Sequence, residues 1–546
     1  MLRRSEFCSR SKEAGVLMDG VTMDGQHGKF IESTQEMILR FTSEISTQSL
    51  TWTQQIIDSP AELESIERDV HDAYARGADM LIAGLIAVSF KDGKVHQAAE
   101  QTRRQFSRPL QKGRERSVAV QLLGGMIIWA TTLYCGPKKP RFRKDDAPRV
   151  GLDITLAQFG FGKAVSPGLQ SRVARQMALC PSIVFAQQEL SRQGVALNTK
   201  AIKRITYQCG DGLLALRRHR IRLLRQGKLK STGELAGKRV SVQIDGGRMK
   251  IRGKMQLRAP FVEPTDADGL LSGDAPGRSK AKPRRTFAAD WREPKLMTIF
   301  IHDEHGKMVK KTKATMDGTL LGPDAIAEIV AMHLHRLGAS EALSVTFVAD
   351  GAPWIWDRID RIIELAGLKN VPTYQVLDCC HAVHHVSLAL ASLGLSRAQR
   401  NPLYRQLRSQ LRNGQWQQVV ATLSELQDPE SPIAELETQI SYIRRHGEAS
   451  RLMYVRYKQL GIPCGSGAIE SGIRRVINLR LKSNAMFWKS EHAESMLQVR
   501  SQVIPDQWDV AMKELSEFRR REAYDGWDWP PENMSIKNEN STTLAT

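Results

Sequence analysis

The sequence contains little cysteine, and its cysteines follow no regular spacing. Only 7 of the 546 residues are cysteine, at positions 8, 135, 180, 209, 379, 380 and 464. An odd number cannot pair completely within one chain, and no CxxC pair is present. The pattern excludes a disulfide framework and predicts a protein of the reducing cytoplasm.

Long apolar runs are also missing. The N-terminal stretch MLRRSEFCSRSKEAG is basic, but no apolar segment follows it, so no cleaved signal peptide is expected. The longest uncharged stretch, 117–137 around LLGGMIIWATTLYCG, is interrupted by Gly and Gln. A membrane span needs about 20 consecutive, predominantly apolar residues. We interpret this stretch as a β-hairpin and expect no membrane partner.

Positive charge is what the sequence has in excess. Lys and Arg number 79 against 59 Asp and Glu, a formal net charge of +20. Such an excess predicts a polyanionic partner, nucleic acid before membrane, although a basic surface can also serve solubility alone. The hydrophobic fraction of 41% is sufficient for packed cores and excludes a mostly disordered chain.

A helix-turn-helix pattern lies within a strongly helical segment. Over 182–192, Ile183, Ala186 and Leu190 recur at the i, i+3, i+7 spacing of a helix face that packs inward. Gly194 marks a turn after this helix. The pattern therefore predicts one helix followed by a tight turn.

A second helix should follow this turn, capped by Asn198 or Thr199 and ending at Gln208. Its exposed face would carry three cations: Lys200, Lys203 and Arg204. In helix-turn-helix proteins the second helix enters the major groove, so these cations are expected to contact DNA. An ordinary helical hairpin would produce the same pattern, and both interpretations stay open here.

Three carboxylates stand where an α/β fold builds its sites. The strand RVSVQIDGG ends in Asp245, the strand SVTFVADGA ends in Asp350, and Glu470 falls in the first helical turn after GSG. Strand ends bring carboxylates to one edge of a sheet, and carboxylate oxygens suit Mg²⁺ or Mn²⁺. Two such ions, about 3.5–4 Å apart, activate a water or a 3′-hydroxyl at a phosphodiester. An Asp-Gly pair after a strand is also a common turn.

The order of elements favours the metal site. From residue 239 the pattern runs strand-acid, strands, helix, strand-acid, helix, strand, helical block and helix-acid. This is the order of a ribonuclease-H-like core. The acids lie 350 − 245 = 105 and 470 − 350 = 120 residues apart. An all-helical insertion over 383–460 explains the second gap, and GRMKIRG is expected to pair with the first strand.

Four stretches resemble the DDE transposases of the bacterial ISKra group and, more distantly, the Mutator-like transposases. They are VQIDGG, FVADGAPWIW, VLDCCHAVHHV and GSGAIESGIRRVINLRLKSNAMFW. The resemblance covers about residues 170–505, with weaker likeness in 117–160. Two features depart from the family: Ala485 stands where a Gly is usual, and the N-terminal region lacks the paired cysteines of a zinc ribbon.

The resemblance implies a catalytic domain that cuts and joins DNA by metal-assisted hydrolysis and transesterification, with no covalent enzyme–DNA intermediate. The family's acidic triad falls on three residues that would hold two Mg²⁺ or Mn²⁺ ions: Asp245, Asp350 and Glu470. Its Asp-x-x-His motif falls on Asp378 and His381, which adds His381 to the catalytic candidates. Its basic-aromatic motif falls on Arg480, Lys482 and Trp488.

His381 has three interpretations. It could bind zinc with neighbouring Cys and His residues of DCCHAVHH, although ligands at such tight spacing are geometrically awkward. It could contact the scissile phosphate or order the active site. It could also be a satisfied core histidine.

Cations follow Glu470 on or just past the same helix: Arg474, Arg475, Arg480 and Lys482. Beside a phosphoryl-transfer site they would bind phosphates, although a solvated helix face has the same composition. Trp488 could stack on a splayed base of the DNA or anchor the core. Trp354 and Trp356 are interpreted as core residues.

The function expected from these features is that of a DNA transposase. It would bind the terminal inverted repeats of an insertion sequence and catalyse metal-dependent cleavage and strand transfer. Its partners would be double-stranded DNA, at the element ends and the target, and a second copy of the chain, since joining two ends needs at least a dimer. It would act in the cytoplasm, on the nucleoid. The alternatives are a sequence-specific DNA-binding regulator, a catalytically inactive transposase descendant, or a ribonuclease-H-like nuclease that cuts without joining.

The fold expected is α/β, with helical DNA-binding regions before a ribonuclease-H-like core that contains an all-helical insertion. The expected divisions are a helical N-terminal region (1–116), a β-hairpin and basic linker (117–169), a helix-turn-helix region (170–236), the first part of the core (237–382), the helical insertion (383–460), the final core helices (461–530) and a disordered tail (531–546).

Overall fold

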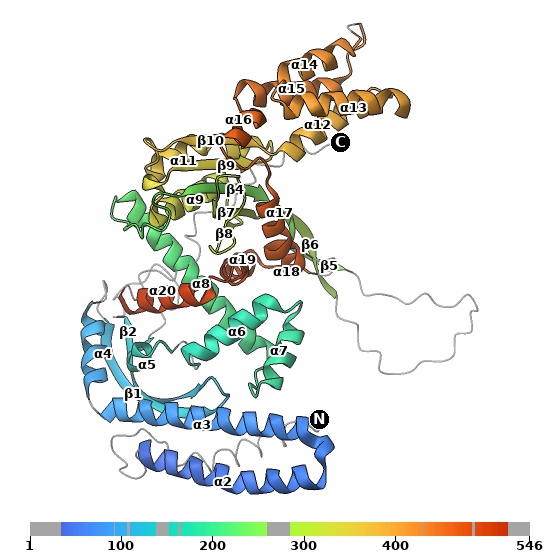
Figure 1. The fold of residues 1–546 in the computed structure, drawn as a ribbon. Helices are drawn as coiled ribbons and strands as arrows, with labels where there is room; N and C mark the ends of the chain where they lie inside the picture. The colour runs from blue at the N-terminus through green and yellow to red at the C-terminus, as the bar shows by residue number, and fades with distance from the viewer. Residues whose placement is uncertain are drawn as a thin grey trace, which may run out of the picture. The chain divides into compact units, whose positions relative to one another are not determined.

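The chain forms two compact units. The computed structural model describes residues 34–91, 93–105, 110–137, 152–161, 165–258, 284–428, 430–482 and 486–521 (Figure 1). Unit 1 comprises Met1–Leu216 and Asp506–Thr546, and unit 2 comprises Arg217–Pro505. The expected tail and most of the basic linker lie outside the described residues.

Unit 1 is mainly helical and contains one β-hairpin. Its elements are α2 (Thr34–Asp58), η1 (Pro60–Glu62), α3 (Leu63–Lys91), α4 (Lys94–Gln105), β1 (Leu110–Gln121), β2 (Ile127–Pro137), β3 (Leu152–Asp153), α5 (Ile154–Gln158), α6 (Pro167–Leu179), α7 (Ile183–Arg192), the first part of α8 (Thr199–Arg225) and α20 (Trp508–Arg521). Strands β1 and β2 pair antiparallel and confirm the predicted hairpin. Its turn contains Gly125 at φ +98°, a conformation that glycine adopts without strain.

The hairpin turn is anchored on helix α3. The buried Asp79 carboxylate accepts hydrogen bonds of 2.9 Å from the backbone N–H groups of Gly124 and Met126. Residues 60–90 form the one helical stretch of the described chain that is long and apolar enough to cross a membrane, and 39% of its apolar window is buried in the protein. Core helices pass the same test, and the Asp79 contacts identify this one as a packing helix.

Helices α7 and α8 lie where the sequence predicts a helix pair. Ser182 caps α7 by accepting from Phe185 N, and Asn198, rather than Thr199, caps α8 by accepting from Ala201 N. Ala186 and Leu190 are buried as expected. Helix α8 does not end at Gln208, because its apolar spacing continues, and it runs on to Arg225.

The last helix, α20, belongs to unit 1. Trp508 donates its indole N–H to Ser171 Oγ at 2.8 Å, and Arg519 donates to Gln170 Oε1 at 3.2 Å. The expected final division at 461–530 is thus shared between the two units, which change at Asp506.

Unit 2 is built on a five-stranded mixed sheet with the order β10-β9-β4-β7-β8. Its strands are β4 (Arg239–Gly246), β7 (Lys295–His302), β8 (Thr315–Thr319), β9 (Ser344–Ala349) and β10 (Thr373–Leu377). Strands β4, β9 and β10 are parallel, whereas β7 and β8 are antiparallel to their neighbours. The predicted α/β class is confirmed.

Both faces of this sheet are covered. Val242 and Ile244 of β4 pack in one core with residues of α9 (Pro323–Leu337) and α11 (Ile359–Ala366). Against the other face lie α17 (Gly467–Gly472), which contacts β4 and β7, and α19 (Ser490–Val503), which contacts β8. Burial on two faces explains why SVTFVA is apolar without alternation.

The helical segment after β10 confirms the absence of strands expected over 383–460 among its described residues. Its helices are α12 (Cys379–Ser392), α13 (Arg397–Arg412), α14 (Trp416–Glu425), α15 (Ala434–Glu448) and α16 (Tyr454–Gln459). The remaining elements are η2 (Ala339–Glu341), α10 (Pro353–Trp356), the π-helix η3 (Ile473–Asn478) and α18 (Leu479–Leu481).

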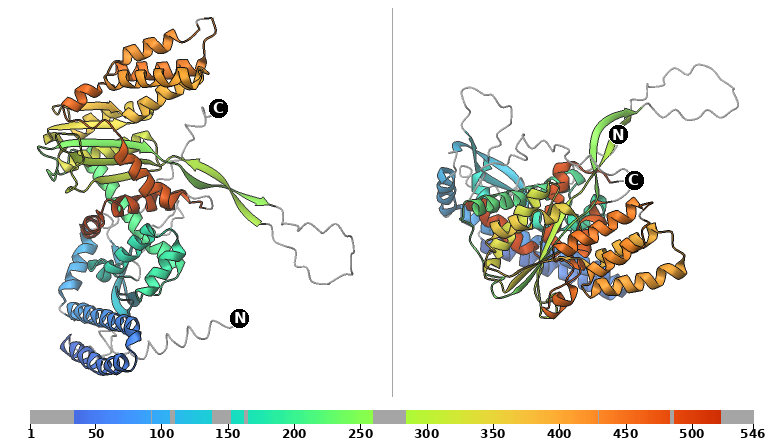
Figure 2. Two further views of the ribbon diagram at one scale, coloured as in Figure 1. Left: turned by 45° about the vertical axis from the view of Figure 1, so that its right-hand side comes forward. Right: turned by 90° about the horizontal axis from the view of Figure 1, so that it is seen from above.

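A second sheet contains two strands, β5 (Met249–Arg258) and β6 (Arg284–Arg292), which pair with each other. The expectation that GRMKIRG pairs with the first core strand is therefore wrong. The chain does not turn back after β4, and β5 instead continues beyond it, away from the main sheet (Figure 2).

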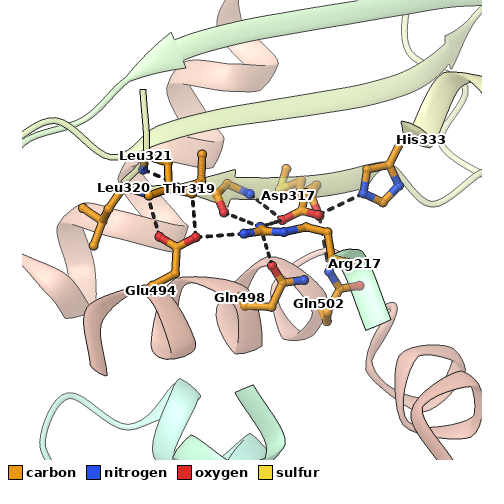
Figure 3. Close-up of polar contacts among 11 residues, drawn as sticks. Arg217, Asp317, Thr319, Leu320, Leu321, His333, Glu494, Gln498 and Gln502 are labelled. Carbon is orange, nitrogen blue, oxygen red and sulfur yellow. Dashed lines mark hydrogen bonds and ion pairs between the residues drawn. The ribbon is translucent and has the colours of Figure 1, made fainter. Parts of the chain in front are cut away.

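A buried ionic cluster joins elements of unit 2 (Figure 3). Arg217, in the part of α8 that belongs to this unit, donates to Asp317, Glu494 and Gln498 at 2.8–2.9 Å. His333 Nε2 lies 2.9 Å from the other Asp317 oxygen. Burial would raise the pKa of Asp317, but Arg217 and His333 outweigh it and hold that pKa below its usual value. The acids of this cluster are thus matched by fixed donors.

Candidate metal centre

Three aspartates follow three adjacent parallel strands. In the sheet register Ile244 of β4 lies beside Ala349 of β9, and Ala349 lies beside Leu377 of β10. The next residue along each strand is an aspartate: Asp245, Asp350 and Asp378. Because neighbouring strands are about 4.8 Å apart, the three residues form a row along one edge of the sheet.

Glu470 is brought to this edge by a side chain of β4. Gln243 donates to Gly465 O and accepts from Ile469 N, both at 3.0 Å, and so fixes the start of α17 on the sheet. Ser466 N donates to Asp378 Oδ2, and Ser466 Oγ lies 2.9 Å from Glu470 Oε1. These contacts bring Glu470 to Asp378 at the end of β10; the group of ligand atoms found among the described residues does not include Asp245 or Asp350.

His381 stands in the first turn of α12. Asp378 caps this helix by accepting from His381 N at 2.9 Å, and its Oδ1 lies 3.3 Å from His381 Nδ1. Ligand atoms of Asp378, His381 and Glu470 all lie within 4.8 Å of one another. The Asp-x-x-His spacing thus has a physical meaning: the aspartate caps the helix and pairs with the histidine one turn later.

Neighbouring carboxylates in the row repel each other's negative charge. Burial, and then the neighbouring Asp350, raise the pKa of Asp245 to about 6. Burial also raises the pKa of Asp350, although the backbone N–H of Ala352 and the charge of His381 work in the opposite direction. These two carboxylates are therefore short of compensating cations in the described structure.

Asp378 behaves differently from its two neighbours. Burial favours a higher pKa, but the hydrogen bonds from His381 and Ser466 outweigh it and lower the pKa of Asp378. The same contact with Asp378, helped by Asp350 and Glu470, raises the pKa of His381. Asp378 and His381 thus form an ion pair at one end of the row.

Glycines next to two of the acids make room for protein side chains. A Cβ at Gly246 would lie 2.1 Å from Glu293 Oε1, and one at Gly351 would lie 2.1 Å from the Tyr442 ring. Glu293 adds a further carboxylate near Asp245 and pairs with Lys295 at 3.3 Å. These glycines therefore admit the side chains of Glu293 and Tyr442.

The donor set fits Mg²⁺ or Mn²⁺. It is rich in carboxylate oxygens, and the raised pKa values of Asp245 and Asp350 indicate sites that a divalent cation would relieve. The cysteine-containing zinc site receives no support: the ligand group found among the described residues contains no cysteine. Burial raises the pKa of Cys379, which disfavours the thiolate that zinc requires.

The basic residues after Glu470 divide into two groups. Arg474, Arg475 and Lys482 are exposed, as expected for phosphate contacts. Arg480 is only 4% exposed and its guanidinium lies 5.4 Å from the ring centre of Trp488, which is 7% exposed. The expected DNA contacts of Arg480 and Trp488 are corrected accordingly, because the Trp488 indole N–H donates to Leu481 O inside the core.

A π-helix presents the exposed arginines. The segment η3 begins three residues after Glu470 and contains Arg474 and Arg475. Arg500 of α19 donates to the carbonyl oxygens of Arg475 and Val476. These bonds satisfy backbone acceptors of the widened turn, and such turns are frequent at functional sites.

The remaining cations predicted to contact DNA lie in unit 1. Lys200, Lys203 and Arg204 are all exposed on the first turns of α8. Of the other predicted tryptophans, Trp356 is buried, while Trp354 is half-buried with Lys295 Nζ 5.0 Å from its ring centre.

Neither the place of Asp378 in the acidic row nor a role for Gln243 or Glu293 was predicted from the sequence. Asp378 follows the strand VPTYQVL as Asp350 follows SVTFVA, so the rule used for the other two acids would have found it. No sequence signal marks Gln243 or Glu293, because their roles depend on which segments the fold brings together.

Comparison with family models, with curated proteins and with solved structures finds no match for this chain. The resemblance to DDE transposases therefore remains a hypothesis. A functional proposal has to be carried by the side chains at the strand ends.

Proposed function

We propose that this protein is a DDE-type DNA transposase that binds the ends of an insertion sequence and cleaves and joins DNA with divalent metal ions. The observation that carries the proposal is the row of aspartates at neighbouring strand ends, with Glu470 and His381 beside it. An excess of buried carboxylates in one place is costly unless cations bind there.

The strand arrangement supports the ribonuclease-H-like interpretation. Strands β4, β7 and β8 form an antiparallel set, and β9 and β10 extend the sheet from the other side of β4. The helices α13–α16 stand between β10 and the helix of Glu470, which is where the sequence places an insertion. These features agree with the expected core and its helical insertion.

Asp245, Asp350 and Glu470 would hold two Mg²⁺ or Mn²⁺ ions, and Asp378 would complete the set of oxygen donors. When bound, such ions supply Lewis-acid activation of a water or a 3′-hydroxyl and stabilise the leaving oxygen. His381, held by Asp378, would place a cationic N–H near the phosphate. Arg474, Arg475 and Lys482 would bind neighbouring phosphates through their exposed charges.

Recognition of the element ends is assigned to α7 and α8, as a helix-turn-helix, with Lys200, Lys203 and Arg204 against double-stranded DNA. The net charge of +20 supports a polyanionic partner and action on the nucleoid of the cytoplasm. Two ends must meet, so the active form would be at least a homodimer, which light scattering of the DNA complex would measure.

The test is a cleavage assay on a plasmid that carries the DNA flanking the native gene, run with Mg²⁺, Mn²⁺ or chelator. Wild type should nick at the repeat tips only with metal. Asp245→Asn should abolish nicking and retain end binding. Asp360→Asn, an exposed aspartate of α11, is the matched control and should cleave like wild type.

Other outcomes separate the alternatives. End binding without cleavage in any metal would replace the proposal with a DNA-binding regulator or an inactive descendant. Cleavage without joining, in an assay that follows transfer of a labelled end, would indicate a nuclease. Cleavage by Asp245→Asn equal to that of wild type would refute the metal site.

A further inference from the structure

A β-ribbon extends directly from the acidic row. Strands β4 and β7 pair up to Gly246 and Lys295, Gly247 N then donates to Pro294 O at 2.8 Å, and β5 and β6 continue the same two arms. The ribbon projects from the main sheet (Figure 2). Any polymer bound with one of its groups at Asp245 therefore lies beside the base of this ribbon.

One face of the ribbon is cationic and the other is buried. Met249 and Ile251 are buried, and Arg248, Lys250 and Arg252 alternate with them. Arg248 and Arg252 are exposed and Lys250 is half-buried. The period of two along a strand places these three cations on the same face.

Two aromatic side chains lie among these cations. Trp291 pairs with Lys250 across the strands and is 46% exposed, an unusual exposure for so large an apolar side chain. The charged groups of Arg248 and Lys250 each lie 5.1 Å from its ring centre. Phe487 is 37% exposed, with Lys250 Nζ 5.7 Å from its ring centre. We call these five residues, Arg248, Lys250, Arg252, Trp291 and Phe487, the ribbon face.

The base of the ribbon is held by a third segment. Arg252 N donates to Trp488 O at 2.8 Å and Trp488 N donates to Lys250 O at 3.1 Å, so the segment at Trp488 runs beside β5. The buried indole of Trp488 fixes this segment to the core. The base of the ribbon, and with it the ribbon face, is therefore preorganised.

The charged composition of the ribbon is also unsuited to binding an apolar partner. Residues 248–258 and 284–293 contain eight Lys and Arg and two Asp and Glu, so 8 − 2 gives +6. Cations interleaved with exposed aromatic rings are typical of surfaces that bind phosphates and stack on bases.

We propose that the ribbon face binds an unpaired DNA strand leading to the acidic row, with Trp291 stacked on a base and Arg248 and Lys250 on phosphates. The inference rests on the proposed function for the choice of DNA. An unpaired strand is favoured over a duplex because a duplex base already stacks on its neighbours and offers no free face to an indole. Arg248 stands three residues after Asp245 along the chain, at the base of the ribbon.

The test measures binding of labelled oligothymidylate and of a duplex by fluorescence anisotropy, with the full chain in chelator so that no cleavage occurs. Trp291→Ala should weaken single-strand binding by about 5- to 150-fold, the effect of one stacked base. Trp291→Phe should retain most of the affinity. Duplex affinity should change less than about twofold, within experimental scatter on this scale.

Matched controls use residues off the ribbon. Trp129→Ala removes a tryptophan of β2 that is 49% exposed and should leave single-strand affinity unchanged. Arg248→Gln should lower the slope of log affinity against log salt by about 0.7, whereas Lys369→Gln, an exposed cation of unit 2, should not.

Two results would overturn the inference. Equal affinities of Trp291→Ala, Trp129→Ala and wild type would show that Trp291 does not stack. Equal losses for single strand and duplex would show a duplex contact instead. Because oligothymidylate binding is measured in chelator and cleavage is measured with metal, failure of the ribbon and failure of the proposed cleavage are seen in separate assays.

Discussion

Unit 2 contains two clusters of ionisable side chains that differ in charge balance. Around Arg217, two carboxylates meet one guanidinium, a histidine and an amide, and every contact is close. At the strand ends, Asp378 and Glu470 lie beside one histidine, Asp245 and Asp350 follow the two neighbouring strands, and Glu293 is paired with Lys295. Residue type alone therefore does not single out a candidate site; the mismatch between acids and their donors does.

One acid of each cluster, Asp317 and Asp245, shows this difference in its pKa. The pKa of Asp317 lies below its usual value because Arg217 and His333 outweigh burial, whereas burial and Asp350 raise the pKa of Asp245 to about 6. The first cluster holds the fold together in its charged form. In the second cluster, the charged form of Asp245 is disfavoured by burial and by Asp350, and a bound cation would compensate for this negative charge.

The largest expected effect is on catalysis. Asp350→Asn should lower the single-turnover cleavage rate in Mg²⁺ by about 10³-fold or more, because it removes a metal ligand. Asp360→Asn should cleave at the wild-type rate. A loss of less than about tenfold in the first variant would place Asp350 outside the reacting centre.

The next effect is on stability and concerns the balanced cluster. Arg217→Met should lower the free energy of unfolding by about 3–5 kcal/mol, because it leaves two buried carboxylates without their cation. Arg225→Met on the same helix, which breaks an exposed pair with Glu328, should cost less than about 1 kcal/mol. Urea unfolding measures both, and similar losses would remove the distinction between them.

Substitution of Asp245 in the acidic row is expected to raise the free energy of unfolding, by less than Arg217→Met lowers it. The pKa of Asp245 is raised from 3.8 to about 6, so the folded state binds more protons than the unfolded state between these values. The loss of stability caused by the raised pKa of Asp245 is absent below pH about 4, grows as pH rises, and is complete above about 6. Asp245→Asn should therefore stabilise the metal-free protein by about 1–3 kcal/mol at pH 7 and have little effect at pH 4.

Thermal unfolding at the two pH values checks this sign. Mg²⁺ should stabilise wild type more than Asp245→Asn, because binding to the folded state alone adds to its stability. Destabilisation by Asp245→Asn at pH 7 without metal would contradict the account.

The smallest effect concerns unit 1. Lys203→Gln and Arg204→Gln should each lower the salt slope of duplex binding by about 0.9 and leave cleavage of prebound DNA unchanged. Arg192→Gln, at the exposed end of α7, is the control. If both variants have the salt slope of wild type, Lys203 and Arg204 do not contact DNA phosphates.

The sequence predicted the parts of this fold that depend on local pattern. The strand-end positions of Asp245 and Asp350, the hairpin with its Gly124–Gly125 turn and the first helix of the α7–α8 pair follow from periodicity and turn chemistry. The convergence of Glu470 was predicted from element order, but the residue that secures it, Gln243, could not be, since its partners lie more than 200 residues away.

Burial was the property that local pattern could not supply. Arg480 and Trp488 have the composition of a DNA contact, yet both are buried, and the Trp488 indole N–H donates to Leu481 O. Trp291 is the reverse case. Nothing in the sequence marks it as exposed, but it is exposed because the ribbon leaves the main sheet.

Isothermal titration of Mn²⁺ into the metal-free protein tests the central claim most directly. The account predicts binding to wild type and to Arg225→Met, weakened by about tenfold or more in Asp245→Asn and falling as pH drops through about 6, where Asp245 gains its proton. Absence of Mn²⁺ binding to wild type, or equal binding to Asp245→Asn, would contradict it.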